Sequence, residues 1–282
     1  MAAAAREMGA RLVVPGARLR EVCEAVEGEI RRLGADLAFP TQTSRNQVAA
    51  HYCPAPEDGT VYAEGDLAKL DIGVQVDGWV VDTAVTVNVG GRGPQRLVDA
   101  ARAALEAAIG TAGPGVPIAR VSAAIESTLR IHGARPMKNL CGHHVGRWTV
   151  HSPPPVPNSP DGSAERLRVG AVLAIEPFAT DGLGFVVEKG RPEVFRLPPG
   201  QKNGAGLHAG VMAAIASRNG LPFSRRDLGA LPRPEVDETL AALTARGRLA
   251  SYPPLVEASG KMVAQAEHTI YVGPEGVDVL TR

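Results

Sequence analysis

The sequence predicts an α+β fold made of two related halves, with a helical insertion late in the chain. When the chain is offset by 99 residues, segment 15–34 aligns with segment 114–133, and an Ala-rich helical segment precedes each of them. Each half then continues into an apolar strand that ends in a carboxylate, GDLAKLD at 65–71 and GAVLAIE at 170–176. The same order of helical and strand patterns thus occurs twice in the chain, which indicates a duplicated unit.

The helical segments of the two halves share their boundaries as well as their pattern. Pro15-Gly16 and Pro114-Gly115 open them, and Gly34 and Gly133 close them. Apolar residues recur between these points at the spacing of an amphipathic helix, and glycine is typical just beyond a helix C-terminus. The preceding helices are expected at 2–12 and 95–109. We therefore expect the halves to be related by an approximate twofold axis.

A β-hairpin is predicted at residues 67–89. Segments 67–75 and 79–89 are rich in β-branched residues, and Asp77-Gly78 between them is a two-residue turn signal. If Val76 pairs with Trp79, the numbers of paired residues sum to 155.

This register places two acidic residues together. Asp71 then faces Ala84 and Asp82 faces Gly73, so both carboxylates lie on one face as diagonal neighbours. A bulge in the hairpin would shift the register. Acids in so apolar a hairpin are costly without a partner, which favours a shared cation.

The second half differs by an insertion. Its return strand is expected at 263–272, and the long segment before that strand has no counterpart in the first half. Helices are expected at 204–218 and 233–247, within a subdomain of residues 204–258. Residues 1–200 and 260–282 are then expected to form the main body.

Composition narrows the functional classes. Lys and Arg balance Asp and Glu at 30 each and the pI is near 7.1, so neither a nucleic-acid nor a membrane partner is expected. The start of the chain lacks the apolar core of a signal peptide. The three cysteines have no motif spacing and are interpreted as reduced thiols, which favours a cytoplasmic protein.

Five side chains at strands or strand ends are candidate metal ligands. A set of four carboxylates with one imidazole suits manganese, iron or cobalt better than a thiolate-rich zinc site. Four carboxylates around one point repel one another unless cations lie between them, and two divalent ions would balance their charge. Water activated by such ions attacks carbonyl groups. The five candidates are Asp71, Asp82, His143, Glu176 and Glu267.

Over nearly its full length the chain resembles the type II methionine aminopeptidases, in an archaeal-like form. That family has the pseudo-symmetric pita-bread fold of metallopeptidase family M24, with a late helical, winged-helix-like insertion. The matching segments are AFPTQTSRNQVAAHYCP (38–54), KLDIGVQVDGWVVDTAVTV (69–87), NLCGHHVGRWTVH (139–151), AIEPFAT (174–180), YPPL (252–255) and AQAEHTIYV (264–272).

The resemblance implies a role for each matched residue. The five candidates match the ligands of two divalent ions, with Asp82 and Glu267 bridging them and Glu176 also acting as general base. His51 and His151 match substrate-contacting histidines, and either could donate to the peptide oxygen. Phe39 and Tyr252 match walls of the methionine pocket. The implied substrates are N-terminal methionyl peptides and nascent chains, with transient ribosome association. The implied metals are Co, Mn, Fe, Zn or Ni.

Two features depart from the family pattern, and two other functions compete. Pro-rich segment 153–157 is expected to stiffen or displace the pocket rim. The double histidine is unusual, and His143 is assigned as the ligand because it directly follows Gly142. A prolidase-like X-Pro peptidase would use the same five ligands. A non-catalytic relative that binds ribosome or RNA would have lost ligands, whereas this chain has all five.

Overall fold

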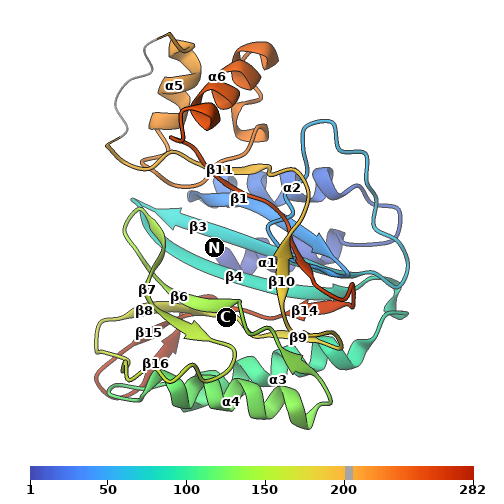
Figure 1. The fold of residues 1–282 in the computed structure, drawn as a ribbon, viewed down its shortest axis with the longest axis vertical. Helices are drawn as coiled ribbons and strands as arrows, with labels where there is room; N and C mark the ends of the chain where they lie inside the picture. Colours follow the sequence, from blue (N-terminus) through green and yellow to red (C-terminus); the bar gives the residue numbers. More distant parts are fainter. Residues whose placement is uncertain (201–205) are drawn as a thin grey trace.

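The computed structural model describes residues 1–200 and 206–282. Two helix pairs lie against the sheets, and a third pair forms a separate group at the end of the molecule (Figure 1). The helices are α1 (Ala2–Leu12), α2 (Leu19–Arg32), α3 (Gln95–Thr111), α4 (Ile118–Ile131), α5 (Ala209–Ala216) and α6 (Arg233–Ala245), with 3-10 turns η1 (Val89–Gly91) and η2 (Arg226–Leu228).

The first half carries a three-stranded antiparallel sheet in the order β1 (Asp36–Arg45), β3 (Leu67–Val76), β4 (Trp79–Asn88). The predicted hairpin register is confirmed, because Asp71 pairs with Ala84 and Gly73 pairs with Asp82 without a bulge. The Asp77-Gly78 turn therefore fixes which face of the sheet both aspartates share.

The second half carries a five-stranded sheet that lies beside β4 of the first half (Figure 1). Smaller sheets complete the body between the two halves. The five strands run in the order β16 (Val277–Val279), β15 (His268–Val272), β8 (Val172–Ile175), β6 (Cys141–Gly146), β7 (Thr149–Pro157). The smaller sheets are β14 (Val263–Gln265), β9 (Phe178–Thr180), β5 (Arg135–Pro136); β10 (Val186–Glu188), β13 (Leu255–Glu257), β2 (Val48–Ala50); and β11 (Val194–Arg196), β12 (Ala250–Tyr252).

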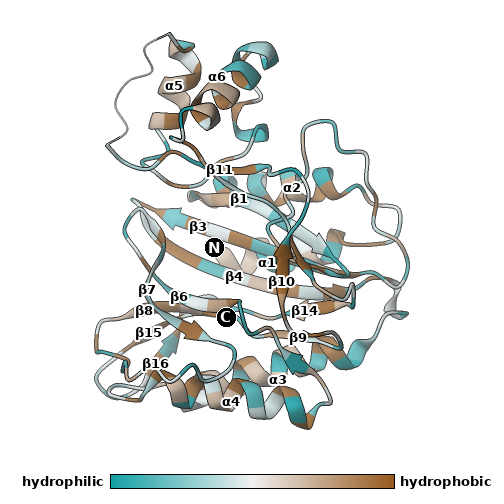
Figure 2. Ribbon diagram, in the orientation of Figure 1, coloured by the Kyte–Doolittle hydropathy of each residue, from teal (hydrophilic) through white to brown (hydrophobic). Residues whose placement is uncertain are grey.

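The predicted duplication is present in both sequence position and hydrogen bonding. Helices α2 and α4 have 14 residues each and begin 99 residues apart. Before each of them, a glycine N–H donates to a loop carbonyl at 2.8 Å, from Gly16 to Tyr62 and from Gly115 to Leu167. Figure 2 shows hydrophobic and hydrophilic residues interspersed along α3 and α4, as expected for helices with one buried face.

The return strand of the second half is broken, although the sequence predicted a continuous strand at 263–272. β14 ends at Gln265 and β15 begins at His268. The backbone N–H of Glu267 donates to Ala84 of β4 at 3.0 Å, which takes it out of its own sheet. The break brings Glu267 against the hairpin of the first half.

Threonine side chains join the two halves. The Thr269 hydroxyl accepts from the N–H of Asp82 and donates to its carbonyl, both at 2.7 Å. Thr86 makes the same two-way contact with Gln265, at 2.7 and 2.6 Å. These contacts hold the backbone of Asp82 and, at Gln265 and Thr269, the backbone on both sides of Glu267.

The late helices lie within the ranges predicted at 204–218 and 233–247, although α5 spans only Ala209–Ala216, and they have an apolar core of their own. Residues of α5 and α6 pack on Phe195, Phe223 and Leu228. A buried ion pair attaches this group to the body, since two nitrogens of Arg226 lie 2.8 and 2.9 Å from the Glu27 carboxylate. The division into a body and a subdomain of residues 204–258 stays a proposal, and its first residues lie outside the described part of the chain.

The helices of the described residues do not combine the length and apolar character that a bilayer crossing requires.

Candidate metal centre and substrate pocket

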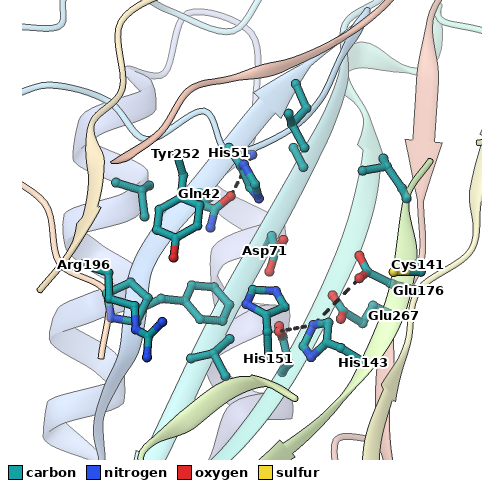
Figure 3. A pocket seen from close by; sticks show the side chains of 18 of the residues that line it. Gln42, His51, Asp71, Cys141, His143, His151, Glu176, Arg196, Tyr252 and Glu267 are labelled. Carbon is teal, nitrogen blue, oxygen red and sulfur yellow. Dashed lines mark hydrogen bonds and ion pairs between the residues drawn. The ribbon is translucent and has the colours of Figure 1, made fainter. Parts of the chain in front are cut away.

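The five candidate ligands line one cavity of roughly 410 Å³ between the two halves. Asp71 lies on β3, Asp82 on β4 and His143 on β6. Glu176 follows the last residue of β8, and Glu267 lies in the break between β14 and β15. Figure 3 shows Glu176, Glu267 and His143 close together, with Asp71 directed toward them from β3.

Three of the five side chains come close enough to share one ion. One ligand atom each of Asp82, His143 and Glu267 lies within 4.8 Å of the others, and all three residues are buried. His143 Nε2 is 3.5 Å from Asp82 Oδ2 and 3.8 Å from Glu176 Oε1. Burial lowers the pKa of His143 to about 4, so its ring is neutral at pH 7 and has a lone pair for a metal.

The buried carboxylates of the cavity repel one another when no cation lies between them. Burial, and then the charge of Asp82, holds the pKa of Asp71 well above its usual range. Glu176 and Glu267 have raised pKa values from the same two causes in the same order. Burial raises the pKa of Asp82 to about 7. Divalent ions would reverse this penalty, because a nearby positive charge favours the ionised form.

Unpaired oxygens in the cavity fit the same interpretation. Asp71 Oδ1 and Asp82 Oδ1 are buried and have no hydrogen-bond partner among the described residues. A buried acceptor without a donor is costly, and hard carboxylate oxygens are suited to divalent ions. The donor set of the cavity therefore fits a metal centre.

Gln265 is a residue of the site that our interpretation of the sequence missed. It is buried, and its Nε2 lies 3.3 Å from both Glu176 Oε2 and Glu267 Oε2, as a donor to each. The signal that could have found it is its position two residues before Glu267, in a segment expected to be extended. Gln265 holds two of the acidic side chains in place.

The two predicted substrate histidines line the same cavity. The ring centre of His151 is 4.1 Å from that of His143, and the ring centre of His51 is 5.8 Å from that of Tyr252 in an edge contact. Burial lowers the pKa of His51 to about 4, and burial followed by the His143 ring lowers the pKa of His151 to about 3. Both rings are neutral at pH 7 and can donate one N–H.

His51 adopts an unusual backbone conformation, with φ at +66°. Its N–H donates to Gln42 Oε1 at 2.8 Å, which holds it there. Left-handed φ is uncommon for a residue other than glycine, and such strain gathers at functional sites.

Phe39 forms a buried wall of the cavity and packs on Gly73 of the neighbouring strand. A side chain at position 73 would overlap the Phe39 ring. Glycine is thus required by this close approach. Tyr252 lines the cavity from β12.

Other sequence expectations fall outside the cavity. The Pro-rich segment 153–157 is not among the lining residues, which end at His151 on this strand. His144 contacts the carbonyl of Pro154 at 2.8 Å, and His268 contacts the Thr281 hydroxyl at 2.9 Å. Neither histidine is among the residues that line the cavity.

A fold of two pseudo-symmetric halves around an Asp/His/Glu cluster defines a metallopeptidase of the pita-bread type. The model of metallopeptidase family M24 matches residues 1–273. The chain belongs to this family.

Within this family, the chain is similar to proteins named methionine aminopeptidase. The chain is 44% identical to a methionine aminopeptidase of Thermococcus kodakarensis, over 96% of this chain and 92% of that one. A crystal structure of a methionine aminopeptidase from Thermotoga maritima matches with a TM-score of 0.72 and 26% identity, covering 100% of this chain and 92% of the other. A prolidase from Pyrococcus horikoshii matches at 18% identity with a TM-score of 0.61, over 100% of this chain and 60% of its own length, and shares the fold.

Proposed function

We propose that this protein is a methionine aminopeptidase that removes the N-terminal methionine from peptides and nascent chains with a small second residue. The observation that carries the proposal is the gathering of five candidate ligands and two neutral histidines in one cavity, in a chain 44% identical to a methionine aminopeptidase. The three free cysteines suit action in the reducing cytoplasm, where new chains emerge from ribosomes.

Five residues would hold two divalent ions: Asp71, Asp82, His143, Glu176 and Glu267. Cobalt, manganese, iron, zinc and nickel all accept carboxylate and imidazole ligands. When bound, such ions supply water that is activated as a nucleophile at neutral pH and polarise a carbonyl oxygen.

The protein's own residues then orient the substrate and move its protons. Glu176, at the edge of the cluster, takes a proton at a carboxylate oxygen and gives it to the leaving amine. His151 lies beside His143 and donates its N–H to the oxygen of the scissile peptide, where negative charge develops. His51, fixed by Gln42, faces the substrate from the Tyr252 side of the cavity.

The cavity also sets the specificity. Phe39 and Tyr252 offer an apolar, aromatic surface, which suits an unbranched thioether side chain. A free amine is expected to lie at the closed end of the cavity, so acetylated peptides should not be cut. The closed space around the metal ligands leaves little room for a bulky second side chain.

Turnover of four peptides tests the proposal: Met-Ala-Ser, Met-Leu-Ser, Leu-Ala-Ser and acetyl-Met-Ala-Ser. We expect cleavage of the first alone at a high rate. Equal turnover of Met-Ala-Ser and Leu-Ala-Ser would contradict the methionine pocket. Turnover of Ala-Pro in place of Met-Ala-Ser would favour a prolidase-like enzyme.

A further inference from the structure

One charged residue of the cavity has no part in the chemistry described above. Arg196, at the end of β11, is the only lysine or arginine among the described lining residues. Figure 3 shows it beside Tyr252, across the cavity from Glu176 and Glu267. The cavity is thus acidic at the candidate metal centre and basic on the opposite wall.

The Arg196 guanidinium is anchored but not neutralised. Its Nε donates to the carbonyl of Gly220 at 2.9 Å, which fixes the plane of the group. Within residues 1–200 and 206–282, no other hydrogen bond or ion pair is made by its two terminal nitrogens. The side chain is half-buried. A planar fork with two free donors is suited to a carboxylate.

The position of Arg196 relative to the reaction follows from its neighbours. Arg196 lines the same cavity as His151, the residue proposed to face the scissile peptide. Arg196 and Gly220 are only half-buried, so this side of the cavity is open to solvent. A substrate with its amine at the acidic cluster must leave the cavity on the open side, and the residues after the scissile bond pass there.

We propose that Arg196 is a specificity-determining residue that binds a carboxylate carried by the substrate just after its small second residue. The inference rests on the proposed function. A side-chain carboxylate at the third residue and the terminal carboxylate of a tripeptide have the same chemistry. The opposite wall is occupied by the candidate metal centre and the reacting end of the substrate, so Arg196 is the cation among the described lining residues that can meet a carboxylate beyond the second residue.

Peptides that differ in charge alone test this inference. With the metal-loaded enzyme, kcat/KM is measured for Met-Ala-Asp-Gly-amide and for its neutral isostere Met-Ala-Asn-Gly-amide. We expect the wild-type enzyme to favour the acidic peptide by about three- to tenfold, mainly through KM, because the contact is the same before and during reaction. The preference should shrink as salt is added. Met-Ala-Ser against Met-Ala-Ser-amide shows whether a terminal carboxylate serves as well.

Substitutions of Arg196 show whether this residue binds a substrate carboxylate or only supports the structure of the cavity. Arg196→Gln should bring the acidic-to-neutral ratio close to one, and Arg196→Lys should restore part of it. Arg147→Gln is the matched control, since Arg147 Nε also donates to a backbone carbonyl, of Asp77 at 2.9 Å, but lies outside the cavity lining. That control should keep the wild-type ratio.

Three results would overturn the inference. A wild-type ratio near one would do so, as would a ratio that Arg196→Gln leaves unchanged or that Arg147→Gln abolishes equally. In these cases Met-Ala-Asn-Gly-amide is still cleaved, so the proposed function stands. If the wild-type enzyme with metal cleaves none of the peptides, the proposed function fails and the inference fails with it.

Discussion

His143 Nε2 lies 3.5 Å from Asp82 Oδ2, although the histidine belongs to the second half of the fold and the aspartate to the first. Because the His143 pKa is lowered to about 4, this contact is not an ion pair at neutral pH. The neutral imidazole nitrogen and the carboxylate oxygen both offer lone pairs here, and a cation between them would accept both. The candidate metal centre therefore depends on the docking of the two halves.

Asp82→Asn and Glu267→Gln should each lower metal-dependent turnover of Met-Ala-Ser by at least about tenfold. Each change removes a charge proposed to lie between two cations. Without metal, Asp82→Asn should melt at a higher temperature than the wild type at pH 8, because it removes a buried, repelled charge. Adding metal should then raise the Tm of Asp82→Asn by less than it raises the Tm of the wild type.

A higher Tm without metal together with a smaller gain on adding metal would indicate that Asp82 binds metal and is not needed for packing. A variant that melts lower than wild type both with and without metal would point to Asp82 as a packing residue. Asp161→Asn, outside the cavity lining, is the control and should change neither quantity.

Gly73→Ala should lower kcat/KM for methionyl peptides, by roughly tenfold if Phe39 is pushed into the pocket. Gly28→Ala is the matched control, since a side chain at that position of α2 meets nothing within 4 Å. It should leave kcat/KM unchanged and stabilise the helix by about 0.5–1 kcal/mol. An active Gly73→Ala enzyme with normal KM would show that Phe39 does not contact the methionine side chain.

Arg226→Met should lower the free energy of unfolding by about 3–5 kcal/mol, because Glu27 is left buried without its partner. The double variant Glu27→Leu/Arg226→Met should recover most of that loss. Arg233→Met removes exposed pairs with Glu57 and Asp237 and should cost less than about 1 kcal/mol. Urea denaturation measures all three, and equal losses for Arg226→Met and Arg233→Met would contradict the anchoring role.

Stability should depend on pH through His51. Its pKa falls from 6.5 to about 4 on folding, so between these values the unfolded chain binds more protons than the folded one. The His51 contribution is absent above pH 6.5, and stability is lost as the pH falls toward 4, by on the order of 3 kcal/mol. His51→Asn should lose less stability than wild type between pH 7 and about 4.5 in urea denaturation. Equal losses would contradict the burial of this ring.

The parts of the fold that follow local rules were predictable from sequence. The Asp77-Gly78 turn fixes a two-residue hairpin, and with it the pairing of Asp71 and Asp82, because turn chemistry sets the register. The equivalence of α2 and α4 followed from glycine and proline at matched positions.

Features that depend on contacts between distant segments were not predictable. The break at Glu267 arises from its hydrogen bond to Ala84 of the other half. Arg196 lies in none of the matching segments, and it reaches the cavity only because β11 packs beside the two halves. Gln265 lies in a matching segment, but its contacts with Glu176 and Glu267 exist only once the chain is folded. The metal roles of the five candidates, predicted from residue type and resemblance, stay predictions.

Removal and return of metal tests the central claim most directly. Protein stripped with a chelator and dialysed should show almost no turnover of Met-Ala-Ser, and stepwise addition of cobalt or manganese should restore it, with saturation near two ions per chain. Tm should rise over the same additions, because bound ions relieve the repulsion among the buried carboxylates. Turnover near the original rate in stripped protein, with metal content shown to be negligible, would contradict the assignment of this cavity as a metal-dependent aminopeptidase site.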